Sequence, residues 1–191
     1  MSKQPTLSDA TLTVTNRYAT LRFERDDVRN ALTGTALIDD LCATTAWANA
    51  DLRIGCENTR FGETFVNLGI IPGDGGAWFL QRLVGYQRAA ELTFSGRIID
   101  SEEALTLGLL LECVPKETLI ATAERYASEY ASKPPQALRA TKRLMKLAQR
   151  QELGDFLDVC ADVQSQCHHT EDHQRALNAF LTKTDARFEG N

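Results

Sequence analysis

The residues best suited to chemistry lie between Arg60 and Gly85, where a glycine-rich turn surrounds one carboxylate. The turn reads Ile71-Pro72-Gly73-Asp74-Gly75-Gly76 and leads into a helix-like pattern. Glycine lets a backbone pass close to a ligand, proline fixes its own φ, and a helix N-terminus favours anionic or polarised oxygen atoms. Desolvation beside an apolar pocket raises the pKa of a carboxyl group and suits it to proton transfer. Asp74 is therefore a candidate catalytic residue, and capping of the following helix is its structural alternative.

Glu63 is the second acidic candidate, and its role depends on the local backbone. If residues 61–65 are extended, Glu63 lies on the same face as Phe65 and reaches the pocket, because alternate residues of a strand share a face. If the segment is already helical, Glu63 points away from the Phe65 side. A solvated carboxylate is the structural alternative.

The surrounding patterns predict the elements that position this turn. Residues 11–24 alternate as two short strands around a turn at Asn16-Arg17, and residues 52–56 form another strand before a turn at Glu57-Asn58. Helical patterns run from about 37 to 50, over 77–83 and over 88–94. Asp100 opens the next helix with a capping pattern. The leucines that follow are expected in the core: Leu105, Leu107, Leu109, Leu110 and Leu111.

The second half of the chain reads as helical. Helices are predicted over 116–131 and 136–151, and Gly154 is expected to separate a last pair over 155–166 and 171–183. A chain of 191 residues is the size of one domain, or of one domain with a helical appendage. We place the core at residues 1–131 and the helical region at residues 132–191.

Composition limits the classes of partner and compartment. A net charge of −5 argues against nucleic acid as the main partner. No apolar run reaches membrane-spanning length, and the first ten residues contain no signal-peptide core, so we expect no membrane contact. The five cysteines are odd in number and show no CxxC pattern, which indicates reduced thiols in the cytoplasm.

The three histidines form a cluster near the start of the last helix. His169 and His173 stand at i and i+4, a spacing that occurs in metal sites. No third ligand is close in sequence, so a surface cluster is the favoured interpretation and no metal is expected.

Four segments together resemble the crotonase family, also called the enoyl-CoA hydratase/isomerase family. They are RDDVRNALTGTALIDDL (25–41), RFGETFVNLGIIPGDGG (60–76), LVGYQRAAELTFSGRIIDSEEALTLGLLLECVP (83–115) and DHQRALNAFLTKTDARF (172–188). The resemblance implies an α/β fold with a crotonase-like ββα spiral core and a C-terminal helical trimerisation region. It also implies a homotrimer or dimer of trimers that acts on an acyl-CoA thioester, with coenzyme A as part of the substrate and no further cofactor.

The resemblance also suggests roles for individual residues. Phe65 stands where hydratases of the family carry a catalytic glutamate, whereas isomerases have an apolar residue there and an aspartate in the glycine-rich loop. Asp74 lies one position later than that aspartate. We therefore expect isomerase-like proton transfer through an enolate, with Asp74 and Glu63 as catalytic candidates. The implied substrate-binding residues are Arg29, Ala31, Phe65, Ile71, Pro72, Gly73, Phe180 and Lys183. From the residues alone, Arg29 reads as a solvated charge and Phe180 as a core side chain.

One junction departs from the family pattern. Ala50 is followed directly by Asp51, whereas family members carry several dozen residues between these two segments. The block that they carry supplies both halves of the oxyanion hole, the pair of N–H donors that stabilises an enolate. The sequence therefore leaves two functions open. One is an acyl-CoA-processing enzyme, and the other is a catalytically defective or truncated family member that acts as a binding or scaffold protein.

Overall fold

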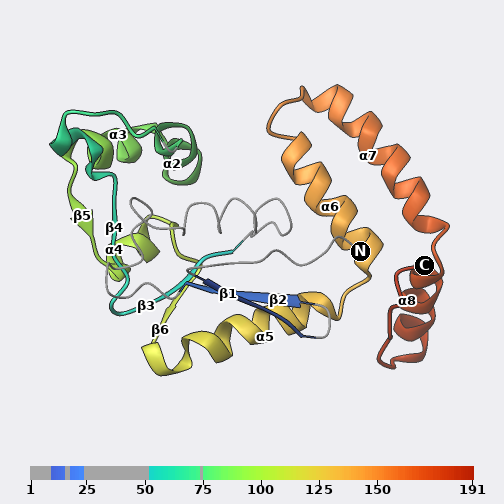
Figure 1. Cartoon of the computed structure of the whole chain (residues 1–191). Coiled ribbons are helices and arrows are strands. Elements are labelled where there is room, and N and C mark those ends of the chain that lie inside the picture. Colours follow the sequence, from blue (N-terminus) through green and yellow to red (C-terminus); the bar gives the residue numbers. More distant parts are fainter. Residues whose placement is uncertain (1–9, 16–17, 24–51, 74) are drawn as a thin grey trace. The chain divides into compact units, whose positions relative to one another are not determined.

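The N-terminal part of the structure is a β-hairpin. The computed structural model describes residues 10–15, 18–23, 52–73 and 75–191 (Figure 1). Strand β1 (Ala10–Thr15) pairs antiparallel with β2 (Tyr18–Phe23), with Leu12 opposite Leu21. The two predicted strands are thereby confirmed. The predicted turn at Asn16-Arg17 and the predicted helix over 37–50 lie outside the described residues.

Two short strand pairs are formed by segments before and after the glycine-rich turn. Strand β3 (Ile54–Cys56) runs parallel to β6 (Glu112–Val114), and β4 (Phe61–Gly62) pairs antiparallel with β5 (Ile98–Ile99). Parallel strands need a long crossover connection, and residues 57–111 supply it with helices. The predicted turn at Glu57-Asn58 is confirmed, and the Thr59 N–H closes it on the Cys56 carbonyl at 2.9 Å.

The described residues of the crossover form three α-helices and one 3₁₀ helix. The 3₁₀ helix η2 (Thr64–Leu68) precedes the glycine-rich turn, and α2 (Gly76–Val84), α3 (Tyr86–Ser95) and α4 (Ser101–Thr106) follow it. Gly85 separates α2 from α3 with φ 81°, a backbone angle that favours glycine. The Asp100 side chain caps α4 by accepting the Glu103 N–H at 2.9 Å, as the capping pattern predicts.

The core of this part of the chain lies where α2, α3, α4 and β5 meet. It consists of apolar side chains that are at least nine-tenths buried: Leu80, Val84, Ala89, Leu92, Ile99, Ala104, Leu109 and Leu110. The prediction that all five leucines from 105 to 111 are core was wrong for two of them. Leu105 is 41% exposed and Leu111 is 51% exposed. The six-residue α4 turns Ala104 inward, and a neighbouring position on so short a helix points to another side.

The remaining elements are helical. After the 3₁₀ turn η3 (Lys116–Thr118) come α5 (Leu119–Ala131), α6 (Pro135–Leu147), α7 (Leu153–His168) and α8 (Glu171–Thr182). The chain forms two compact units, Met1–Arg125 and Tyr126–Asn191. Gly154 was predicted to precede α7, but it lies within the first turn of that helix. In the part of the chain that the structure describes, no helix is both long and apolar enough to cross a membrane.

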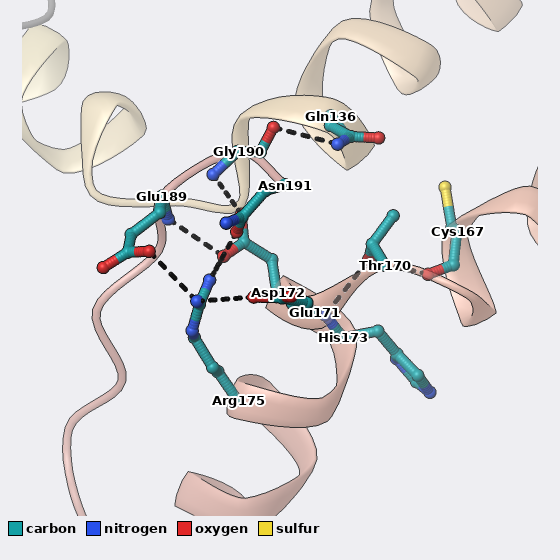
Figure 2. A network of polar contacts seen from close by, with 10 residues as sticks. All are labelled: Gln136, Cys167, Thr170, Glu171, Asp172, His173, Arg175, Glu189, Gly190 and Asn191. Atoms are coloured by element: carbon teal, nitrogen blue, oxygen red, sulfur yellow. Dashed lines mark hydrogen bonds and ion pairs between the residues drawn. The ribbon is translucent and has the colours of Figure 1, made fainter.

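A buried carboxylate organises the second unit (Figure 2). Asp172, in the first turn of α8, is 1% exposed and accepts the N–H groups of Glu189 at 2.9 Å and Gly190 at 2.7 Å. Arg175 donates to the same carboxylate at 2.8 Å, and the Gln136 side chain donates to the Gly190 carbonyl at 2.9 Å. These bonds fix residues 189 and 190 to α8 and α6.

The Asp172 environment also sets its protonation. Burial raises the pKa of this carboxyl, but the hydrogen bonds from Glu189, Gly190 and Arg175 outweigh burial, so the pKa lies below its ordinary value. The carboxylate is therefore the form that the fold of this unit requires.

Candidate active site

The first unit contains a mainly apolar cavity of about 210 Å³ beside the start of α2. Its wall combines the segment before β3, strands β4 and β5, and the inner faces of α2 and α3. The lining residues are Arg53, Phe61, Gly62, Glu63, Gly76, Phe79, Leu80, Leu83, Leu92, Ile99 and Leu109. Arg53 and Glu63 are the two charged residues among them. The cavity thus pairs an apolar surface with one carboxylate, a composition that is typical of ligand sites.

Glu63 lies at the point where β4 ends and η2 begins. Its backbone has φ −94° and ψ 68°, so it belongs to neither the strand nor the helix that the sequence left as alternatives. The side chain lines the cavity and Phe65 does not, which separates two residues that the extended alternative placed on one face. The Glu63 side chain is half-buried, and its Oε2 atom is shielded from solvent.

The Glu63 carboxylate rests against Gly76, the first residue of α2. A Cβ atom added at Gly76 would collide with Oε1 and lie 2.5 Å from Oε2. The missing side chain of Gly76 is therefore what admits the carboxylate to the N-terminus of α2, where the helix dipole and the exposed N–H groups favour negative charge. The contact joins Glu63, which precedes the glycine-rich turn, to Gly76 at the end of the turn.

The turn between η2 and α2 is held by short backbone bonds. The Ile70 N–H donates to the Phe65 carbonyl at 3.2 Å, and the Gly73 N–H donates to the Ile71 carbonyl at 2.8 Å. Ile71 is exposed, Pro72 is half-buried, and Phe65 is half-buried on η2. Gly75 is the N-cap residue of α2, with φ 93°. Asp74 lies outside the described residues, so its catalytic and capping roles both stay predictions.

Two side chains anchor the elements around the cavity. Arg53 donates through Nε to the Leu109 carbonyl at 2.7 Å, and its own carbonyl accepts the Leu111 N–H at 2.8 Å. Asn67 of η2 donates to the Gly96 carbonyl at 2.9 Å, which joins η2 to the end of α3. Neither Arg53 nor Asn67 carries a sequence signature of this role, because both bind backbone carbonyls that are distant in sequence.

An ion-pair cluster lies on the outer side of α3 and α4. Arg97 donates through Nε to Glu91 at 2.7 Å and through Nη1 to Glu103 at 2.8 Å. Hydrogen bonds from this guanidinium lower the pKa of both carboxyls, and the two carboxylates in turn raise the pKa of Arg97. The cluster is absent from the cavity lining, so we assign it to the packing of α3 on α4.

The other predicted binding residues lie elsewhere. Arg29 and Ala31 fall outside the described residues. Phe180, on α8, is 80% exposed, so the alternative that made it a core side chain was wrong. Lys183 ends α8 in the left-handed conformation with φ 55°. The role of each of these residues stays a prediction.

The comparisons with known proteins define the family. The family model for enoyl-CoA hydratase/isomerase matches residues 45–191, and the chain belongs to this family. A short-chain-enoyl-CoA hydratase from Clostridium acetobutylicum is 35% identical over 71% of this chain and 52% of its own length. A 1,2-epoxyphenylacetyl-CoA isomerase from Escherichia coli K12 is 32% identical over 73% of this chain and 53% of its own length.

The solved structures agree with this assignment. The crystal structure of an enoyl-CoA hydratase from Bacillus anthracis is 34% identical and superposes with a TM-score of 0.72. The match covers 74% of this chain and 55% of that one. The crotonase-like α/β fold predicted from the four segments is thus confirmed. The chain spans about half the length of the curated relatives named above.

Proposed function

We propose that this protein is an acyl-CoA-processing enzyme that transfers a proton on a CoA thioester through an enolate. The observation that carries the proposal is the apolar cavity with the Glu63 carboxylate against the N-terminus of α2. Asp74 and Gly75 directly precede Gly76, the first residue of α2, in the sequence. This location supports a proton-transfer site because an apolar wall excludes water and the helix N-terminus favours developing negative charge.

In this proposal Asp74 moves the proton. As a carboxylate it accepts a proton from Cα of an enoyl thioester, and the electron pair of the broken C–H bond passes into the enolate. As a carboxylic acid it exchanges its proton with solvent in part of the turnovers and then donates a proton at Cγ, which shifts the double bond and restores the carboxylate. Glu63 is the second carboxylate of the site. Phe65 in place of the glutamate of hydratases favours isomerisation over hydration.

The remaining expectations from the family resemblance belong to the same proposal. Arg29, Ala31, Ile71, Pro72 and Gly73 would contact the acyl-CoA thioester. Two residues of the α8 end, Phe180 and Lys183, would approach the adenine of coenzyme A. The working assembly would be a homotrimer or a dimer of trimers in the cytoplasm, without nucleic-acid or membrane partners. Sedimentation of the purified protein tests the assembly.

A second function is favoured by the Ala50–Asp51 junction. A chain that lacks the oxyanion-hole block would bind or scaffold without turnover. The junction lies outside the described residues. Intact-mass measurement of the protein from its native source tests it first, since a mass several dozen residues larger than these 191 would restore the block and support the enzyme.

Substitution of the two carboxylates tests the chemistry. We expect Asp74→Asn to abolish isomerisation of a 3-enoyl-CoA and Glu63→Gln to reduce it at least about 100-fold, the usual contribution of a positioned acid or base. CoA binding should remain within about threefold of wild type, a change of well under 1.4 kcal/mol. Glu102→Gln is the matched control, because Glu102 is an exposed carboxylate in the first turn of α4. Undiminished turnover by Asp74→Asn would exclude Asp74 as the proton carrier.

A further inference from the structure

The corner between α7 and α8 brings two imidazole rings together. His168 is the last residue of α7, and His173 lies in the first turn of α8. His168 Nδ1 and His173 Nε2 are 3.1 Å apart, and the ring planes meet at 83° with centroids 4.7 Å apart. His169 makes a separate contact, with Nδ1 2.7 Å from the Ser165 carbonyl oxygen. The sequence spacing suggested a pair of His169 and His173, and the structure pairs His168 with His173 instead.

Hydrogen bonds fix the backbone between Cys167 and His173 (Figure 2). Thr170 caps α8, since its Oγ1 accepts the His173 N–H at 3.1 Å and donates to the Cys167 carbonyl at 2.8 Å. Asp172, next to His173, is locked by the bonds from Glu189, Gly190 and Arg175. The corner that carries both rings is therefore preorganised, and little conformational entropy remains to be lost when a ligand joins them.

The distance between the two ring nitrogens suits a metal ion. Two imidazole nitrogens bound at about 2.05 Å and separated by the observed 3.1 Å subtend about 100° at the metal, between octahedral and tetrahedral angles. The helix dipole of α7 places partial negative charge at His168, which favours a cation there. His168 is exposed and His173 is half-buried, so water can complete the coordination shell.

We propose that His168 and His173 form a two-imidazole site for a divalent late transition metal ion such as Zn²⁺, Ni²⁺ or Cu²⁺, for which neutral imidazole is a preferred ligand. In the described ranges, no group of three or more His, Cys, Asp or Glu side chains converges on one point. The site therefore holds the ion with two protein ligands and water, and it binds more weakly than a structural site with four protein ligands. It would clamp the end of α7 to the start of α8.

The chain provides its own controls, because His168, His169 and His173 are its only histidines. Ni²⁺ is the probe, titrated calorimetrically into the untagged full-length protein at neutral pH. We expect one Ni²⁺ per chain, with affinity at least about tenfold weaker in His168→Gln and in His173→Gln. His169→Gln should bind like wild type, and so should Cys167→Ser, which tests a thiolate contribution. A thermal melt without metal verifies that each variant is folded.

Several outcomes would overturn the proposal. Absence of binding at about 1 mM Ni²⁺ would show that the two rings only hydrogen-bond to each other. Equal binding by wild type and His168→Gln would place the ion elsewhere. Loss of binding in His169→Gln together with full binding in His173→Gln would contradict the pairing directly. Proton NMR spectra of the three imidazole rings provide an independent readout, since paramagnetic Ni²⁺ should broaden two ring signals before the third.

Discussion

The contact between Gly76 and Glu63 leads to a prediction that can be worked out from the structure. Alanine normally stabilises a helix relative to glycine by about 0.5–1 kcal/mol. At Gly76, the added Cβ would lie 2.5 Å from Oε2 and 2.6 Å from Cδ of Glu63. Ordinary van der Waals contact is about 3.5 Å, so in Gly76→Ala the carboxylate must retreat by about 1 Å.

That retreat has two consequences with different magnitudes. It removes the favourable placement of a carboxylate at the N-terminus of α2, at a cost of about 0.3–1 kcal/mol, so the helix-propensity gain is cancelled. The stability of Gly76→Ala should therefore equal that of wild type within about 0.5 kcal/mol. A shift of about 1 Å at a catalytic group lowers turnover about 100-fold, and we expect that loss in the isomerase assay.

Gly154→Ala is the matched control. Gly154 also lies in the first turn of a helix, and a Cβ there meets nothing within 4 Å. This variant should gain about 0.5–1 kcal/mol in urea unfolding and leave turnover unchanged. In a Glu63→Ala background, Gly76→Ala should recover the same gain, because the obstructing carboxylate is gone. If Gly76→Ala gains as much stability as Gly154→Ala and keeps full turnover, the Glu63 carboxylate is not held at α2 and the reasoning is wrong.

Two further predictions concern the stability of each unit. Ile99→Ala should lower the free energy of unfolding by about 2–5 kcal/mol, because Ile99 is only 2% exposed. Ile98→Ala, on the same strand but 63% exposed, should change it by less than about 0.5 kcal/mol. Equal losses of stability in the two variants would contradict the described core. Because the folded-state pKa of Asp172 lies below its ordinary value of 3.8, its stabilisation is present above that value and is lost as the pH falls through the folded pKa. The difference in Tm between wild type and Asp172→Asn should therefore be largest near neutral pH and shrink below pH 3.8, and a difference independent of pH would contradict the ionised carboxylate.

The local elements followed from the sequence where a short-range cause acts. The alternation of Leu12 and Val14 with threonines predicted the hairpin strand, and the Asp100 capping pattern predicted the start of α4. Gly96 ends α3 in the left-handed conformation with φ 59°, which glycine adopts readily. These features depend on residues within a few positions of one another, which a single sequence displays.

Features that depend on distant contacts were not predictable in the same way. The Glu63 backbone lies between strand and 3₁₀ helix because β4 pairs with β5, more than 30 residues later. The Asp172 carboxylate accepts N–H groups of residues that lie 17 and 18 positions further along the chain. Backbone N–H groups carry no sequence signature, so these bonds could not be predicted. The burial of Leu109 and exposure of Leu111 likewise follow from tertiary packing, since composition treats both leucines alike.

The family assignment came from the combination of four segments, whereas the site residues within it depended on single positions. The resemblance singled out Phe65 and Asp74 by their side-chain chemistry, and the roles inferred for them stay predictions. The geometry added Gly76 as the residue that admits the Glu63 carboxylate to the helix N-terminus. A glycine in a glycine-rich turn gives no sign in sequence of which side chain fills the space it leaves.

Solvent exchange into a bound acyl-CoA is the measurement that tests the proposed proton transfer most directly. The full-length protein is incubated with a 3-enoyl-CoA in D₂O, and the mass of the thioester is followed with time. We expect deuterium to enter the acyl chain, and we expect Asp74→Asn to slow its entry at least about 100-fold while acyl-CoA binding persists. Asp158→Asn is the control, because Asp158 is exposed, and deuterium should enter the acyl chain at the wild-type rate in this variant. Tight binding without any exchange by the wild-type protein would rule out the proposed proton transfer, and unchanged exchange by Asp74→Asn would rule out Asp74 as the proton carrier.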